Sequence, residues 1–178
     1  QNVDIFQENA MLISDFEKAK SYFLEGIFHA ENEKWEQAEA AFKASQEILP
    51  GRASTVSNLL GVLVAQKKYD EAWLLVNDAL ALGDENSKTN TNVGILHHKS
   101  QNFEDALRFF NKAIDLDSTN FAAFLNKGKV LIEYNQTREG NIGGGGFMLL
   151  HPAESDEQVF IDYREMSPDG ASRDMFLN

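Results

Sequence analysis

Three asparagines that could hold a peptide recur along the chain at one spacing. Asn58, Asn92 and Asn126 follow one another at intervals of 34 residues. An asparagine amide offers two hydrogen-bond donors and an acceptor, which suits holding the backbone of an extended peptide. The same amides can instead bond neighbouring helices within the protein. The sequence leaves both roles open for these three residues.

A second group with chemical potential is the adjacent pair His97 and His98. Neighbouring residues on a helix point about 100° apart, so this pair is poorly placed to chelate one metal ion. His29 stands two periods before His97, and we expect buried or half-buried rings at these positions. The chain has no Cys, which excludes disulfides, cysteine zinc sites and a cysteine nucleophile. We therefore expect no metal and no cofactor.

Charge and composition narrow the class of partner. The chain has 178 residues, 16 Lys+Arg against 28 Asp+Glu, and a net charge of −12. Nucleic-acid binding requires clustered basic residues, so we expect no nucleic-acid partner. Apolar stretches such as 59–65 are much shorter than the roughly 18–20 residues of a membrane span. We expect a soluble protein, a processed chain or a fragment, and the sequence leaves cytoplasm and periplasm open.

The whole central region repeats with the period of the asparagines. Aromatic residues recur at 35, 69 and 103, and alanines at 38, 72 and 106. Ala38, Ala41, Phe42 and Ser45 follow the i, i+3, i+4, i+7 spacing of a helix face. This periodicity predicts helices at 19–32, 34–48, 53–66, 69–82, 87–100, 103–116 and 121–134. A further helix is expected at 4–17, packed before the first repeat.

These repeats resemble the tetratricopeptide repeat (TPR) family, whose 34-residue unit is a helix–turn–helix. The best matching unit contains Asn92-Val93-Gly94, Phe103-Glu104-Asp105-Ala106, Phe110 and Ala113. The resemblance covers about residues 19–134. It implies an all-α, right-handed TPR helical-hairpin solenoid of three repeats and a half repeat. Gly26, Gly94 and Gly128 are expected where the two helices of a unit approach one another.

In this family the first helix of each unit lines a concave groove that takes a partner peptide. The resemblance therefore implies a protein–protein interaction module or scaffold that binds a protein or peptide partner. Lys20, Lys88 and Lys129 in this groove favour a partner segment that carries acidic residues. The predicted groove residues are Lys20, Phe23, Ile27, Asn58, Lys88, Asn92, Ile95, Asn126 and Lys129, together with Ser54, Ser57, Gly61, Thr91, His98, Leu125 and Ile132.

One subgroup of the family clamps the carboxylate terminus of chaperone tails with Lys and Asn in the first unit. Phe23 and Ile27 stand at those positions in this chain. Asn58 and Lys88 match the later clamp positions, but Asn92 stands where an Arg would be. These departures argue against chaperone-tail binding.

Residues after 134 differ in kind from the repeats. Four consecutive glycines, 143–146, break the helical pattern and indicate a linker at 135–146. Residues 147–151 and 158–163 are typical of two short strands. We therefore expect a β-hairpin-like tail behind the solenoid.

The same tail resembles gamma-glutamyltranspeptidase over about residues 140–178. The matching segments are Gly140-Asn141-Ile142-Gly143-Gly144-Gly145-Gly146-Phe147-Met148, Ile161-Asp162-Tyr163-Arg164-Glu165-Met166-Ser167-Pro168 and Ser172-Arg173-Asp174-Met175-Phe176. In that family the Arg of the second segment binds the α-carboxylate of the substrate, which implies this role for Arg164. The family's nucleophile is a Thr in a distant small subunit, and its usual helices before the Gly-rich strand are replaced here by repeats. We therefore expect no catalytic residues and no enzyme activity.

The expected organisation has four parts: an N-terminal helix at 1–18, a TPR domain at 19–134, a Gly-rich linker at 135–146, and a gamma-glutamyltranspeptidase-like fragment at 147–178. An alternative stays open, in which the repeats are a docking module fused to the truncated front of such an N-terminal-nucleophile hydrolase. The last helix should leave Phe124, Leu125, Val130, Leu131 and Ile132 on an apolar face. We expect either the tail to cover this face or two chains to associate through it.

Overall fold

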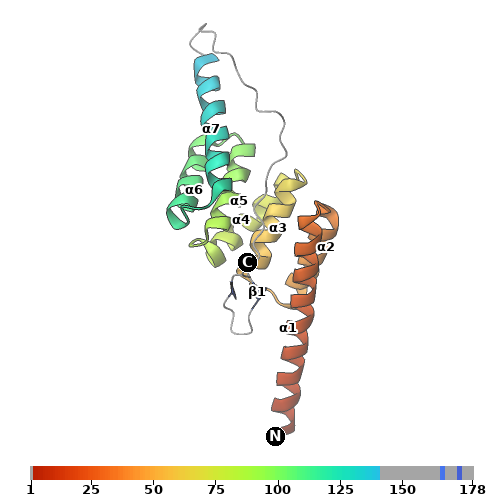
Figure 1. Cartoon of the computed structure of the whole chain (residues 1–178). Coiled ribbons are helices and arrows are strands. Elements are labelled where there is room, and N and C mark those ends of the chain that lie inside the picture. Colours follow the sequence, from red (N-terminus) through yellow and green to blue (C-terminus); the bar gives the residue numbers. More distant parts are fainter. Residues whose placement is uncertain (1, 141–164, 167–171, 174–178) are drawn as a thin grey trace. The chain divides into compact units, whose positions relative to one another are not determined.

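The computed structural model describes the backbone of residues 2–140, 165–166 and 172–173, and the side chains of residues 9–137. Within them the chain forms seven helices, drawn from red to blue in Figure 1. These are α1 (Asn2–Glu31), α2 (Trp35–Ile48), α3 (Ala53–Ala65), α4 (Tyr69–Gly83), α5 (Ser87–Lys99), α6 (Phe103–Leu116) and α7 (Phe121–Gly140). Two short strands, β1 (Glu165–Met166) and β2 (Ser172–Arg173), pair antiparallel with Glu165 opposite Arg173. The chain divides into a first unit, residues 1–83 with 161–178, and a second unit, residues 84–160.

In the first unit α1 packs on α2, α2 on α3, and α3 on α4. α1 and α2 approach closely at Gly26, where an added Cβ would lie 2.6 Å from Cε1 of Phe42. Only glycine lets the backbone of α1 approach the ring this closely. The Phe42 ring also meets the fully buried ring of Phe23 edge-on, with centroids 5.8 Å apart. The N-terminal half of α1 extends past α2 (Figure 1), and Met11, Leu12 and Ile13 on it are exposed.

The second unit repeats this construction with α5 and α6. A Cβ added to Gly94 would lie 2.6 Å from Cε1 of Phe110, matching the contact two periods earlier. Ala106 and Ala113 are fully buried on either side of that ring position. α7 then packs on α6 and also contacts α5. The predicted small residues at 26 and 94 are therefore confirmed as points of close helix approach.

The turn inside each hairpin is closed in the same way. Glu33, Lys67 and Gln101 have positive φ values of 56°, 60° and 62°, and they lie one period apart. The residue after each donates its backbone N–H to the carbonyl five residues before it, as Asn102 does to His97 at 2.9 Å. This bond satisfies a carbonyl that the helix end leaves open. A left-handed residue thus reverses the chain at each hairpin, although none of the three is a glycine.

The structure corrects three expectations. The separate helices predicted at 4–17 and 19–32 are one helix, α1, because no Gly or Pro interrupts residues 15–20. α7 does not end near 134 but continues to Gly140, so residues 135–140 are helical rather than part of a linker. Among the described residues Gly128 faces no second helix, since none of their atoms lies within 4 Å of a Cβ built on it. The strands predicted at 147–151 and 158–163 lie outside the described residues, and the domain boundaries stay a prediction.

Candidate functional site

The first helices of the last two repeats, α5 and α7, meet in the second unit along a polar seam. The buried Asn120 amide donates to the hydroxyl oxygens of Ser87 at 2.8 Å and of Thr91 at 3.0 Å. Its Oδ1 accepts the backbone N–H of Ala123 at 3.0 Å. Asn120 therefore caps the start of α7 and fastens it to α5 with one side chain.

Asn120 was not predicted from the sequence, although a signal was present. Asn86 stands one period earlier, and its Oδ1 accepts the backbone N–H of Thr89 at 2.9 Å at the start of α5. Two asparagines at the period of the repeat, each just before a first helix, are typical of N-caps. Their spacing could have identified both caps.

The other end of the seam is closed by His98 and Glu133. Nε2 of His98 lies 2.9 Å from Oε2 of Glu133. The imidazole is only 5% exposed, whereas Glu133 is about half exposed. His98 was predicted to line the groove, and the structure shows that its ring nitrogen is engaged with Glu133 on α7. Nothing in the sequence spacing identified Glu133 as its partner.

Three of the predicted groove residues are buried inside the second unit. Asn92 is 1% exposed, Ile95 is buried beside it on α5, and Asn126 is 4% exposed. The Asn126 amide donates to the carbonyl of Ala122 at 2.8 Å, so one of its donors is used by its own helix. Lys88 and Lys129 are half-buried. The lysines therefore remain accessible while the asparagine amides do not.

The accessible part of this face is a stripe on α7. Leu125, Lys129 and Ile132 follow one another at i, i+4 and i+7, so they share one side of the helix. Leu125 and Ile132 are close to half exposed. We call these three residues the groove stripe.

The remaining predicted residues lie in the first unit or beyond the described side chains. Phe23 and Ile27 on α1 are buried, and Phe23 packs on Phe42 as a core residue. Asn58 on α3 is buried as well, and Lys20 on α1 is half-buried. The predicted groove residues are thus divided between the two units. Arg164 lies outside the described residues.

The first unit contains an ion cluster that the sequence analysis missed. The buried Glu39 carboxylate on α2 accepts hydrogen bonds from Lys43 at 2.5 Å, Lys68 at 2.7 Å and Gln66 at 2.8 Å. Burial raises the pKa of Glu39, but these hydrogen bonds and the nearby ammonium charge outweigh it and hold the pKa at about 2. Glu39 therefore ties α2 to the end of α3 and the turn after it.

His97 and the acidic residues at the helix starts have contacts or positions that stabilise the fold. The half-buried His97 ring stacks on Phe109 with centroids 5.1 Å apart, and burial lowers the pKa of His97. Glu36, Asp70, Glu71, Glu104 and Asp105 occupy the first turns of α2, α4 and α6. There they complement the positive end of the helix dipole. Among the described residues no group of three or more His, Asp or Glu is placed to hold a metal ion.

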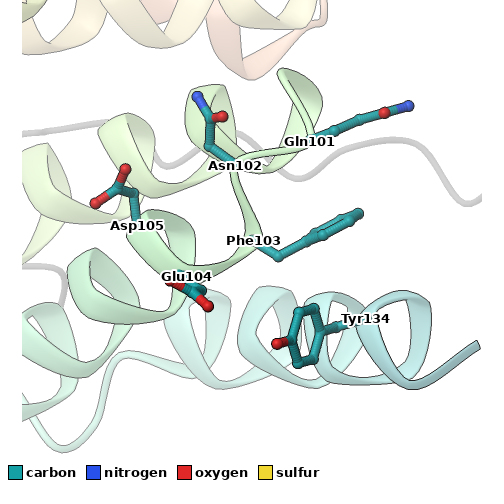
Figure 2. A pocket seen from close by; sticks show the side chains of 6 residues that line it. All are labelled: Gln101, Asn102, Phe103, Glu104, Asp105 and Tyr134. Atoms are coloured by element: carbon teal, nitrogen blue, oxygen red, sulfur yellow. The ribbon is translucent and has the colours of Figure 1, made fainter. Parts of the chain in front are cut away.

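A shallow depression lies at the start of α6, where α7 passes it (Figure 2). Figure 2 shows the rings of Phe103 and Tyr134 on one side and the carboxylates of Glu104 and Asp105 on the other. The two rings meet edge-on with centroids 6.0 Å apart. The polar groups here are the amides of Gln101 and Asn102 and two carboxylates on a helix N-terminus, and we assign no chemistry to this depression.

Comparison with solved structures establishes the fold. The first TPR domain of human RPAP3 matches with a TM-score of 0.63 and 18% identity, over 70% of this chain and 98% of that one. The first TPR of Spaghetti (RPAP3), bound to the HSP90 peptide SRMEEVD, matches with a TM-score of 0.60 and 20% identity, over 69% of this chain and 94% of that one. The chain therefore has the all-α TPR fold predicted from its repeats.

Comparison with characterised sequences divides the chain in two. Anaphase-promoting complex subunit 3 of Schizosaccharomyces pombe is 26% identical over 112 residues, which are 63% of this chain and 17% of that protein. The glutathione hydrolase proenzyme of Escherichia coli is 54% identical over 39 residues, 22% of this chain and 7% of that protein. The chain thus spans less than a fifth of the length of these relatives.

The family model described as gamma-glutamyltranspeptidase matches residues 129–178. This match begins inside α7, upstream of the start near residue 140 that we expected. Our expectation that repeats replace everything before the Gly-rich segment was therefore wrong for residues 129–140. α7 is thus the last helix of the repeats, and its second half is also the start of the segment that matches the gamma-glutamyltranspeptidase model.

No helix in the described part of the chain has both the length and the apolar content to cross a bilayer.

Proposed function

We propose that the chain is a protein-interaction module that binds an extended or helical segment of a partner along its first helices. The observation that carries this proposal is the groove stripe, an accessible apolar–basic–apolar row of Leu125, Lys129 and Ile132. Such a row fits a partner segment with apolar anchors on either side of a carboxylate. The TPR fold supports the proposal, since a TPR domain of this fold is bound to a peptide rich in acidic residues.

The lysines set the charge of the proposed partner. Lys88 on α5 and Lys129 on α7 are both half-buried, which reduces the screening of their charge by solvent. An acidic segment is attracted to them even though the chain carries a net charge of −12, because the local field at a surface outweighs the net charge at a distance. Phe23 and Ile27 at the chaperone-clamp positions are buried, and we do not propose a chaperone tail as the partner.

The asparagines form the second part of the proposal. Asn58, Asn92 and Asn126 would bind the partner backbone, each through a hydrogen bond with a net value of about 0.5–1.5 kcal/mol. All three are buried, so the partner makes its first contact with the groove stripe, and the amides would bind its backbone only after the helices around them move apart. Asn92→Ala is expected to weaken binding by about 2–13-fold.

The test starts from a library of short peptides displayed on phage and selected on the purified chain. Selected peptides should contain apolar residues flanking Asp or Glu. Lys129→Glu should weaken the best peptide by about 3–10-fold, with a loss that shrinks as salt rises. Lys34→Glu makes the same charge change at an exposed position before α2 and should leave affinity unchanged. Equal effects of the two substitutions, or selection of basic peptides, would refute groove binding.

We also propose that the 178-residue chain has no enzyme activity. A transpeptidase site needs a nucleophile, a base and an oxyanion hole placed together, and the match to that family spans residues 129–178. The purified 178-residue chain should therefore release no chromophore from a γ-glutamyl anilide. Release that is abolished by Arg164→Ala would overturn this proposal.

One observation favours a second candidate, in which the repeats dock a larger hydrolase. The enzyme-like segment continues directly from α7 and is 54% identical to a glutathione hydrolase proenzyme. Under this proposal the genomic reading frame continues past Asn178 into a region with the nucleophilic Thr. Sequencing that frame decides between the two candidates, since a stop codon at this point would exclude the second.

A further inference from the structure

The side of α7 next to the groove stripe carries a second apolar row, formed by Phe124, Gly128 and Leu131. Phe124 is 46% exposed and Leu131 is 40% exposed. A Cβ built on Gly128 meets no atom of the described part of the chain within 4 Å. We call these three residues the hairpin face, because Gly128 and Leu131 occupy the positions through which α5 contacts α6, and Phe124 lies one turn before Gly128 on the same side of the helix.

The same unit shows how such a face is filled. One period earlier, Gly94 is covered by the ring of Phe110 from the antiparallel helix α6, and the ring of His97 stacks on Phe109. Gly128 and Leu131 are the equivalents of Gly94 and His97. The first unit fills the corresponding space at Gly26 with Phe42. At both Gly26 and Gly94 the space above the glycine is therefore filled by a phenylalanine from an antiparallel helix.

The two filled sites also define the sequence of that helix. Phe42 stands four residues after Ala38 and three before Ser45, and all three are buried. Phe110 stands four residues after Ala106 and three before Ala113, which are buried as well. The small residues let the two helices approach until the ring reaches the glycine. The pattern is Ala-x3-Phe-x2-small on the apolar side of an amphipathic helix.

We propose that the hairpin face of α7 docks one amphipathic helix of a partner protein, which carries this Ala-x3-Phe-x2-small pattern and places its phenylalanine over Gly128. Lys127 directly precedes Gly128 and is half-buried, so the partner helix carries an acidic residue beside its phenylalanine. This site is distinct from the groove stripe and does not depend on the proposed peptide binding.

Two other occupants fit less well. Residues 141–178 contain Phe147, Phe160 and Phe176, and none of these stands four residues after an alanine. A second copy of α7 would place glycine against glycine and leave the space without a ring. It would also gather Lys127 and Lys129 of both copies at one crossing point, where like charges repel.

The probe for this site is a hydrocarbon-stapled helical peptide with the sequence of α6, Phe103–Leu116, labelled for fluorescence anisotropy. Stapling removes most of the cost of ordering a short helix on binding. We expect saturable binding to the intact chain. Gly128→Leu fills the space above the glycine, and it should weaken binding at least about tenfold. The peptide with Phe110→Ala should lose affinity to a similar degree.

One control variant and three contrary outcomes complete the test. Leu74→Ser changes an exposed leucine on α4 and should leave affinity unchanged. The peptide has the sequence of the chain's own α6 and could instead displace that helix. Binding that survives Gly128→Leu would indicate such displacement, and it would overturn the proposal. The absence of binding would overturn it too. A dimer in sedimentation that Gly128→Leu dissociates would replace the partner helix with a second copy.

Discussion

Gly94 and Phe110 lie so close that a single methyl group on the glycine would stand 2.6 Å from the ring carbon Cε1. This contact joins the two helices of one hairpin, and its copy joins Gly26 to Phe42. Gly128 occupies the same repeat position with open space before it. Three glycines at equivalent positions thus face two different environments, and substitutions at them should have opposite effects.

Gly94→Ala is expected to destabilise the domain by about 1–3 kcal/mol, because the ring and the backbone must move apart. Gly128→Ala is expected to stabilise it by about 0.5–1 kcal/mol, because alanine favours a helix over glycine and meets no neighbour. Chemical denaturation of both variants measures the difference in the free energy of unfolding. Equal effects at the two positions would contradict the close approach at Gly94.

Glu39 should make stability depend on pH in the acidic range. Its folded-state pKa of about 2 lies below the ordinary value of 4.5 for a glutamate, so the unfolded chain binds more protons as the pH falls. The stabilisation is present above about pH 5 and is lost as the pH falls towards 2. Because Lys43 and Lys68 are partly exposed, we expect a loss of only about 1–2 kcal/mol.

Glu39→Gln should remove this part of the pH dependence and destabilise the domain at neutral pH. Urea denaturation of the parent and the variant at neutral and acidic pH gives both free energies of unfolding. Glu47→Gln changes an exposed carboxylate on the same helix and should retain the pH dependence of the parent. A parent and a Glu39→Gln variant with parallel profiles would contradict the assignment.

Gln101 has a φ of 62°, a conformation that glycine adopts without strain. Gln101→Gly is therefore expected to stabilise the hairpin by up to about 1 kcal/mol, whereas Gln101→Val should destabilise it because a β-branched residue resists positive φ. Thermal unfolding measures both. Asn102→Gly, at a φ of −86°, offers a control that should bring no gain.

The contact between His98 and Glu133 should hold the second half of α7 on α5. Glu133→Ala leaves the buried imidazole nitrogen without its carboxylate, at a cost of about 1–3 kcal/mol. Glu133→Gln keeps an oxygen acceptor and should retain most of the stability. Hydrogen exchange of the α7 amides reports the change locally, and unchanged protection in Glu133→Ala would show that the pair does not anchor the helix.

The period of 34 residues predicted the helices, the hairpins and the TPR fold, since each repeat must bury the same apolar positions against its neighbour. The sequence also predicted that small residues lie where helices meet, as Gly26 and Gly94 do. It failed at Glu17–Lys20, where a change of repeat suggested a new helix. Helix ends depend on local breakers, and none is present there.

Only the tertiary structure decided which polar groups meet across the helices. In one repeat Ser45 on α2 donates to the carbonyl of Ala19 on α1 at 2.8 Å, and two periods later Ser87 on α5 donates to the carbonyl of Ala113 on α6 at 2.7 Å. The same two repeat positions are joined, but the donor has changed helix. Likewise the sequence placed His98 on a helix face, whereas the fold brought Glu133 to it from 35 residues away. Such pairs join residues on different helices, and their partners are fixed only when packing sets the distance between the helix axes.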